Sequence, residues 1–279
     1  MDNGHSPLEF IRKYETAIFV ILAIIFSWVF WIPAAWINTG TLGFCLYYIG
    51  VLGPLVAAVE LLILTRGWGG IACLLNGIFK WRVGAEWYVV ALFLPLAIEF
   101  IVLFIVTISG TDLTFDSTLV ANGSTFIGQA YFAAIMAIAF FGYLLPRLLK
   151  SYTPFLASLF LAVFFIAWDL PFVVSNITTG RANYEFWWAI GNLGAFFLFT
   201  WIYRNTRGSL LLLILFNLSL NYFRTFAKGL MQASPVGDLW SLDFSIHALA
   251  GIIILLACWK YFMGKSVDTI GSTEPTPDV

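Results

Sequence analysis

The sequence predicts an all-α integral membrane protein with eight transmembrane helices. Of its 279 residues, 61% are hydrophobic and only 10% are charged, and the mean hydropathy is +0.92. No soluble core could bury that much apolar surface, so the bilayer must act as the solvent for these side chains. The formal net charge of −1 provides no basic face for nucleic acid, and no nucleic-acid partner is expected.

Eight apolar runs are long enough to cross a bilayer, which takes about 20 helical residues. The first is kept as a span and not as a signal peptide, because its apolar core is long and Glu9 and Glu15 dilute the basic residues before it. The eight runs fall at residues 16–37, 42–64, 87–109, 126–149, 154–175, 184–203, 208–227 and 241–263.

A shorter apolar run at residues 71–79 lies between the second and third spans. It is too short to cross the bilayer, and it is flanked by Trp68, Trp81 and Trp87. Tryptophan side chains favour the headgroup region, so we expect this segment to lie in the cytoplasmic interface.

The basic residues predict the orientation of the chain. Cytoplasmic loops carry the excess of lysine and arginine, and both termini are therefore expected in the cytoplasm of a multi-pass protein of the plasma membrane. This needs an even number of spans, in agreement with eight. The two groups are Arg12, Lys13, Arg66, Lys80, Arg82, Arg147, Lys150, Arg204, Arg207, Lys260 and Lys265 on the inner side, and Arg181, Arg224 and Lys228 on the outer side.

These spans divide the chain into three parts. Residues 1–14 form a cytoplasmic N-terminal tail, residues 15–264 form the membrane domain, and the polar residues 265–279 form a tail expected to be disordered. The predicted outer loops contain N-glycosylation sequons at Asn122 and Asn176, a three-residue pattern that also arises by chance.

Metal and cofactor sites are not expected. Cys45, Cys73 and Cys258 lie far apart, and His5 and His247 are the only histidines. None of these spacings is typical of a histidine–cysteine zinc site, and we interpret His247 as a structural residue.

The stretch from Ala133 to Lys150 ends in Gly142-Tyr-Leu-Leu-Pro-Arg-Leu. It resembles the segment after the glutamate pair of the CPBP intramembrane proteases, the Abi-like family of type II CAAX prenyl endopeptidases and bacteriocin-processing or immunity proteins. The family motif runs Glu-Glu-x-x-x-Arg-Gly-x-Leu. When it is aligned on Gly142, the two glutamates fall on Met136 and Ala137 and the arginine falls on Phe141, so all three are replaced.

Other segments carry the same resemblance over Leu52 to Phe223. Phe165-Ile-Ala-Trp-Asp169 resembles the family's Phe-x-x-x-His motif, and Asn217-Leu-Ser-Leu-Asn221 resembles its His-x-x-x-Asn motif. Upstream, Leu52 to Gly67 and Trp81 to Leu96 resemble the helix and the Trp-Arg-Val entry that precede the glutamates. The resemblance implies a CPBP-like helical bundle in which Asp169 and Asn217 replace the two histidines, and Asn221 retains the asparagine.

Amide hydrolysis needs a base that activates water and donors that stabilise the oxyanion. With the glutamates and histidines replaced, we expect no peptidase activity. We interpret the chain as a pseudoprotease that binds a hydrophobic or prenylated peptide, a lipid-like ligand or a membrane protein partner. Asp169, Asn217 and Asn221 should line one mid-membrane cavity, with Asp169 protonated and hydrogen-bonded to one of the two carboxamides.

Two alternatives remain open. The first is an active endopeptidase that uses Asp169 as a replacement base. The second is a transport protein in which Glu60, Glu99 and Asp169, all carboxylates at membrane depth, meet on one ion or proton path.

Overall fold

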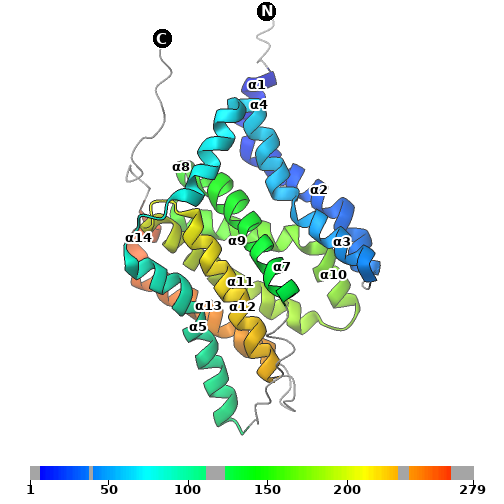
Figure 1. Ribbon diagram of the computed structural model, residues 1–279, viewed down its shortest axis with the longest axis vertical. Coiled ribbons are helices and arrows are strands. Elements are labelled where there is room, and N and C mark those ends of the chain that lie inside the picture. Colours follow the sequence, from blue (N-terminus) through cyan, green and yellow to red (C-terminus); the bar gives the residue numbers. More distant parts are fainter. Residues whose placement is uncertain (1–6, 38–39, 111–122, 232–238, 265–279) are drawn as a thin grey trace, which may run out of the picture.

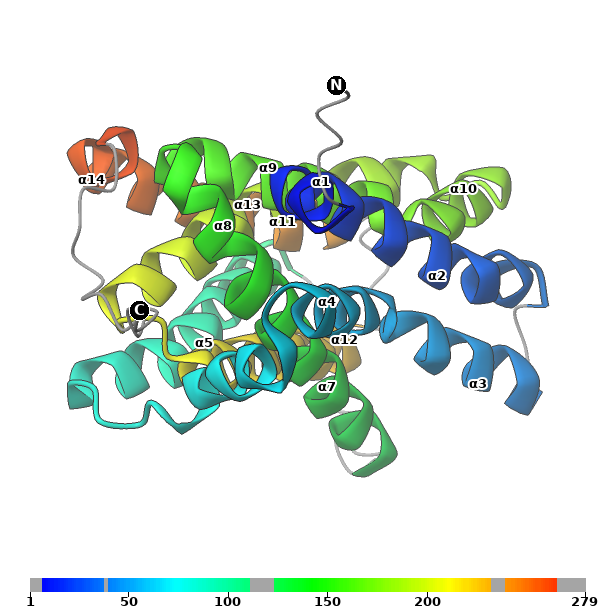
Figure 2. The same cartoon turned by 90° about the horizontal axis from the view of Figure 1, so that it is seen from above.

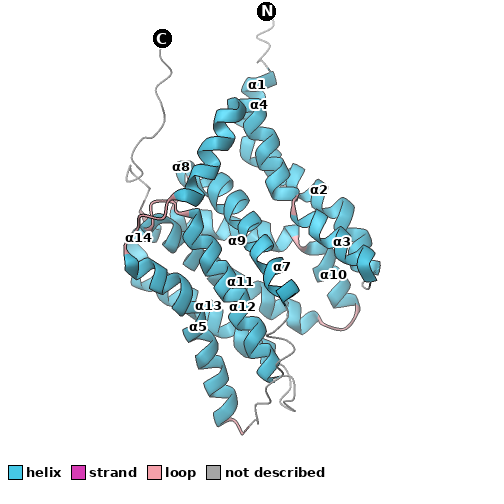
Figure 3. Ribbon diagram, viewed as in Figure 1, coloured by secondary structure: helices cyan, strands magenta, loops and turns pink. Residues whose placement is uncertain are grey.

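The computed structural model describes residues 7–37, 40–110, 123–231 and 239–264. Within these ranges every regular element is a helix (Figures 1 and 3). The elements are α1 Pro7–Lys13, α2 Glu15–Ile37, α3 Gly40–Val51, α4 Gly53–Asn76, η1 Gly77–Phe79, α5 Ala85–Ile108, α7 Gly123–Met136, η2 Ala137–Leu144, α8 Leu145–Ser151, α9 Pro154–Trp168, α10 Leu170–Thr178, α11 Ala182–Asn205, α12 Leu210–Met231, α13 Leu239–Ala257 and α14 Trp259–Met263.

The described residues contain seven helices that are long and apolar enough to cross a membrane, and α9 and α10 qualify together as a pair bent by 57°. The prediction of a multi-pass helical membrane protein is therefore confirmed at this level. The seven are Glu15–Ile37, Gly40–Phe79, Ala85–Ile108, Phe126–Ser151, Ala182–Asn205, Leu210–Ala227 and Trp240–Ala257.

The predicted division of the chain into tails and membrane domain stays a prediction. The N-terminal tail contains the helix α1, whereas the predicted C-terminal tail and the sequon at Asn122 lie outside the described residues.

The helices form two groups with a central layer between them (Figures 1 and 2). One group is α2, α3 and α4, and the other is α5, α11, α12 and α13. The central layer consists of the continuous run α7–η2–α8 together with α9. Side chains of η2 are almost entirely buried, so the stretch that resembles the glutamate helix lies at the centre of the core.

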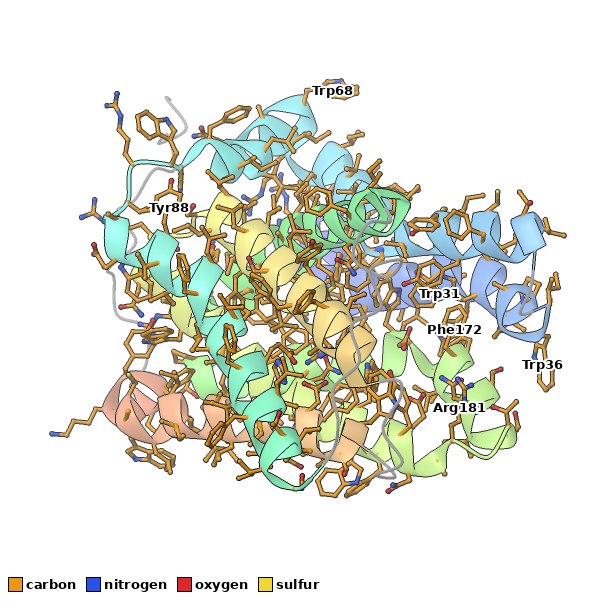
Figure 4. All side chains as sticks on the ribbon, turned by 60° about the horizontal axis from the view of Figure 1, so that its bottom comes forward. Trp31, Trp36, Trp68, Tyr88, Phe172 and Arg181 are labelled. Carbon is orange, nitrogen blue, oxygen red and sulfur yellow. The ribbon has the colours of Figure 1, made fainter. Side chains whose placement is uncertain are left out.

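The segment at residues 71–79 belongs to an arm that follows a kink in α4 and ends in η1. α4 changes direction at Gly67, whose φ of 63° favours glycine, and it then runs on to Asn76. Trp68 follows this break with 77% of its surface exposed, and it points away from the bundle in Figure 4. An interfacial location for this arm stays a prediction.

Two contacts fix the packing around the centre. Glu15 accepts hydrogen bonds from Tyr143 Oη and Arg147 Nη2, both at 2.8 Å, and thereby joins the start of α2 to η2 and α8. On the other side of the molecule, α11 and α13 approach closely through Gly194 and Gly251, as small residues allow in membrane helix pairs.

Candidate functional site

A cavity of about 410 Å³ opens between the two helix groups. Its size is in the range of ordinary small-molecule sites. Aromatic side chains from α3, α7, α9 and α11 form much of its wall, and half of the six polar lining residues come from α12. The polar lining residues are Gln129, Asp169, Asn192, Asn217, Asn221 and Arg224.

Asp169 lies at the break between α9 and α10, where the sequence had predicted one continuous span over 154–175. The physical reason is Pro171, the second residue of α10, which has no N–H and disfavours a helical conformation in the residue before it. The Phe172 N–H bonds to Asp169 O at 3.0 Å, one residue short of the α-helical pattern. The break therefore sets the Asp169 carboxyl in the wall of the cavity.

The backbone carbonyl that this break releases has a partner. Trp28 Nε1 donates to Trp168 O at 3.0 Å, and Trp168 Nε1 donates to Ser27 Oγ at 2.6 Å. The Trp31 ring also lies 5.3 Å from that of Phe172, and both are labelled in Figure 4. α2 thus holds the bend in place, which fits the rule that a broken membrane helix needs its backbone groups satisfied by neighbours.

Asn217 and Asn221 are one turn apart on α12 and bond to each other. Asn221 Nδ2 donates to Asn217 Oδ1 at 2.5 Å and to Asn217 O at 2.9 Å. Within the described residues, which include all three side chains, no hydrogen bond joins Asp169 to either carboxamide. The expectation of such a bond was wrong. The two carboxamides bond to each other along α12, whereas Asp169 lines the cavity at the bend between α9 and α10.

The positions that the resemblance aligns with catalytic residues divide into two sets. Met136 lines the cavity together with Asp169, Asn217 and Asn221. Ala137 and Phe141 are buried outside the lining, and the Phe141 ring stacks on Phe199 with 4.8 Å between the centroids. The structure therefore brings four of the six predicted positions to one cavity. Ala137 also begins the π-helix η2, a form that is rare in proteins and frequent at functional sites.

Arg224 is a site residue that the sequence interpretation missed, because it was assigned to the outer side of the membrane as a topology charge. It lies inside α12 and lines the cavity, with its Nε 3.1 Å from Asp243 Oδ2. The spacing Asn217, Asn221, Arg224 places the three residues on one helix face, and this signal was available in the sequence.

The three carboxylates of the transport alternative lie in different environments. Asp169 lines the cavity, and Glu60 is exposed on α4. Glu99 is only 3% exposed and faces His247, with 3.6 Å between Glu99 Oε1 and His247 Nε2. Asp243 completes this second polar group, and ligand atoms of Glu99, Asp243 and His247 lie within 4.8 Å of one another, close enough for one metal ion.

The sequon at Asn176 lies within α10. Asn176 Nδ2 donates a hydrogen bond to Glu185 Oε1 at 2.6 Å. The nitrogen that a glycan would modify is therefore engaged in a contact between α10 and α11.

Comparisons with known proteins do not assign a family: no protein-family model matches the chain, and no curated protein sequence does. The likeness to the CPBP proteases therefore depends on the motif residues themselves.

Proposed function

We propose that this protein is a catalytically degenerate relative of the CPBP intramembrane proteases that binds an amphipathic ligand within the membrane. The observation that supports this most strongly is the shared position of Met136, Asp169, Asn217 and Asn221. These residues were singled out by motif spacing alone, and they line the same cavity. A cavity at the positions of a former active site would retain the ability to bind after the catalytic groups are replaced.

The chemistry of the wall favours binding over hydrolysis. Asp169 is the one carboxylic acid among the described lining residues, and Met136 offers no base beside it. The oxygen of Asn217 is engaged by Asn221, so this pair is less free to stabilise an oxyanion.

The composition of the cavity favours a ligand with an apolar body and a polar end. Rings such as Phe132, Phe165 and Trp188 offer apolar surface, and the Asp169 carboxyl group and the Arg224 guanidinium offer polar contacts. A hydrophobic or prenylated peptide and a lipid-like molecule share this chemistry. A membrane protein partner that inserts such a segment belongs to the same class.

The proposed topology counts α9 and α10 as one broken span. With the seven long helices this gives eight spans, and both termini lie in the cytoplasm of a plasma-membrane protein. The concentration of basic residues in the predicted inner loops supports this arrangement.

A binding experiment tests the proposal. Purified protein in detergent is titrated with a prenylated CAAX peptide, the same peptide without the prenyl group, and a bilayer lipid, while thermal unfolding is followed. A ligand that binds the folded state should stabilise it by about 2.7 kcal/mol at a hundred times its Kd.

The control variants fill space at two different places. Ala195→Trp fills the cavity and should abolish stabilisation, whereas Leu64→Trp lies on the exposed surface of α4 and should leave it unchanged. The proposal would be contradicted if a ligand stabilised both variants equally. It would also be contradicted if none of the three probes stabilised the wild type. Cleavage of the peptide would favour the endopeptidase that uses Asp169.

A further inference from the structure

The second polar group lies between α5 and α13 and is more deeply buried than the cavity. Glu99 comes from α5, and Asp243 and His247 come from successive turns of α13. Their exposed fractions are 3%, 2% and 0%, and none of them lines the cavity. Charged groups this deep in a membrane protein are costly unless they have a function or a compensating partner.

The hydrogen bonds of His247 fix which ring nitrogen carries the proton. Nδ1 lies 2.9 Å from the backbone oxygen of Asp243 and 3.0 Å from its Oδ1, and both are acceptors. Nδ1 must therefore donate. In the neutral ring the lone pair then lies on Nε2, the form in which histidine binds a metal.

Nε2 is directed at Glu99. His247 Nε2 has no hydrogen-bond partner among the described residues, and it lies 3.6 Å from Glu99 Oε1. This is too long for a hydrogen bond. It does suit two ligands of one ion, because metal–ligand bonds of about 2.0–2.2 Å at a roughly tetrahedral angle separate the ligand atoms by about 3.3–3.6 Å.

We propose that Glu99 and His247 Nε2 bind a divalent transition-metal ion that joins α5 to α13, with Asp243 as the residue that orients His247. Polar atoms of the three side chains all lie within 4.8 Å of one another. Asp243 also holds His247 in the correct tautomer through Nδ1, an arrangement typical of metal-bound histidine. An imidazole ligand favours a metal such as zinc over magnesium or calcium, which prefer oxygen ligands.

Arg224 faces the oxygen of Asp243 that does not face His247, with 3.1 Å between Arg224 Nε and Asp243 Oδ2, while Glu99 supplies a carboxylate on the Nε2 side of His247. Gly194 of α11 packs against this turn of α13, because a Cβ added at Gly194 would lie only 2.9 Å from His247 O. The bound ion would also steady Arg224 at the cavity wall through Asp243. This inference goes beyond the proposed ligand binding and does not depend on it.

The test is a metal count on protein purified without a histidine tag. The protein is treated with a chelator, loaded with Zn²⁺, freed of excess ion and analysed by mass spectrometry of the metal. We expect about one zinc ion per chain in the wild type, and affinity weakened roughly tenfold or more in His247→Gln and Glu99→Gln. The matched controls Glu60→Gln and His5→Gln, the exposed glutamate and the other histidine, should bind as the wild type does.

Two readouts keep the test decisive. Chelator should lower the unfolding temperature of the wild type and leave that of Glu99→Gln unchanged. If His247→Gln fails to fold, Glu99→Gln and the visible absorption of the Co²⁺-loaded protein carry the comparison. Absence of zinc from the wild type, or zinc that is retained by Glu99→Gln and lost from His5→Gln, would overturn the proposal.

Discussion

Asp169 and Asn217 face the same cavity from different helices, and no hydrogen bond joins their side chains. Asn217 is instead paired with Asn221 on its own helix, while Asp169 marks the bend between α9 and α10. Asp169 therefore does not stabilise the packing of helices through a bond to either carboxamide, and its presence in the cavity wall needs another explanation. A ligand contact is the explanation that the proposed function supplies.

The first prediction is that Asp169→Ala changes the free energy of unfolding by no more than about 0.5 kcal/mol, because no side-chain hydrogen bond is lost. Asn221→Leu should cost about 1–3 kcal/mol, because it leaves the buried Asn217 oxygen without its donor. Thermal unfolding of the variants in one detergent measures both. An Asp169→Ala variant destabilised by more than about 2 kcal/mol would return Asp169 to a structural role.

The second prediction concerns catalysis. The purified protein in lipid should not cleave prenylated CAAX peptides above the background of an unrelated membrane protein, because Met136, which aligns with a glutamate of the CPBP motif, offers no base in the cavity. Product formation is followed by mass spectrometry of the peptide. Turnover that disappears in a folded Asp169→Ala variant would establish the enzyme instead.

The long helices could be predicted from the sequence because each apolar run is a local property. The break after Trp168 was missed, although Pro171 is a local signal for it. Apolar composition is the same for a straight and a bent span, so hydropathy alone does not distinguish them. The same limitation applies to η2, whose π-helical form has no compositional signature.

The polar contacts were harder to predict than the cavity lining. Motif spacing selected Asp169, Asn217 and Asn221, and all three line the cavity. Glu99 and His247 are 148 positions apart (247 − 99), and their contact follows from the packing of α5 on α13. Only the i, i+4 spacing of Asp243 and His247 was visible in the sequence. The expectation of no metal site considered the spacing of histidines and cysteines, and the carboxylates at membrane depth were grouped as Glu60, Glu99 and Asp169, without Asp243 or His247.

The third prediction tests the contact between α11 and α13. A Cβ added at Gly194 would lie 2.5 Å from Ala248 Cα, so Gly194→Leu should force the helices apart and cost about 3 kcal/mol, at the upper end for overpacking. Gly69→Leu is the matched control, because a Cβ at Gly69 has nothing within 4 Å. Thermal unfolding of the two variants gives the comparison, and equal stability would show that this interface is not close-packed in the membrane.

The fourth prediction concerns the ion pair between Glu15 and Arg147, whose side chains are 15% and 13% exposed. Removing one partner leaves a largely buried charge, so Arg147→Met should destabilise the protein by about 1–3 kcal/mol. Glu15→Gln retains an acceptor for Tyr143 and should cost less. A double-mutant cycle of the two changes should give a coupling energy of about 1 kcal/mol or more. Strict additivity would show that the two residues act independently.

The last prediction distinguishes eight spans from seven. Single cysteines at Ser117 and Ser272 are introduced into a chain whose Cys45, Cys73 and Cys258 have been replaced by serine, and intact cells are treated with a membrane-impermeant thiol reagent. If α9 and α10 form one broken span, position 117 lies outside and position 272 inside, so only position 117 should be labelled. If the bent pair re-enters the membrane and returns to the same side, the number of spans is odd and both positions should be labelled. Labelling at 272 without 117 would reverse the orientation, and with it the assignment of the basic loops to the cytoplasm.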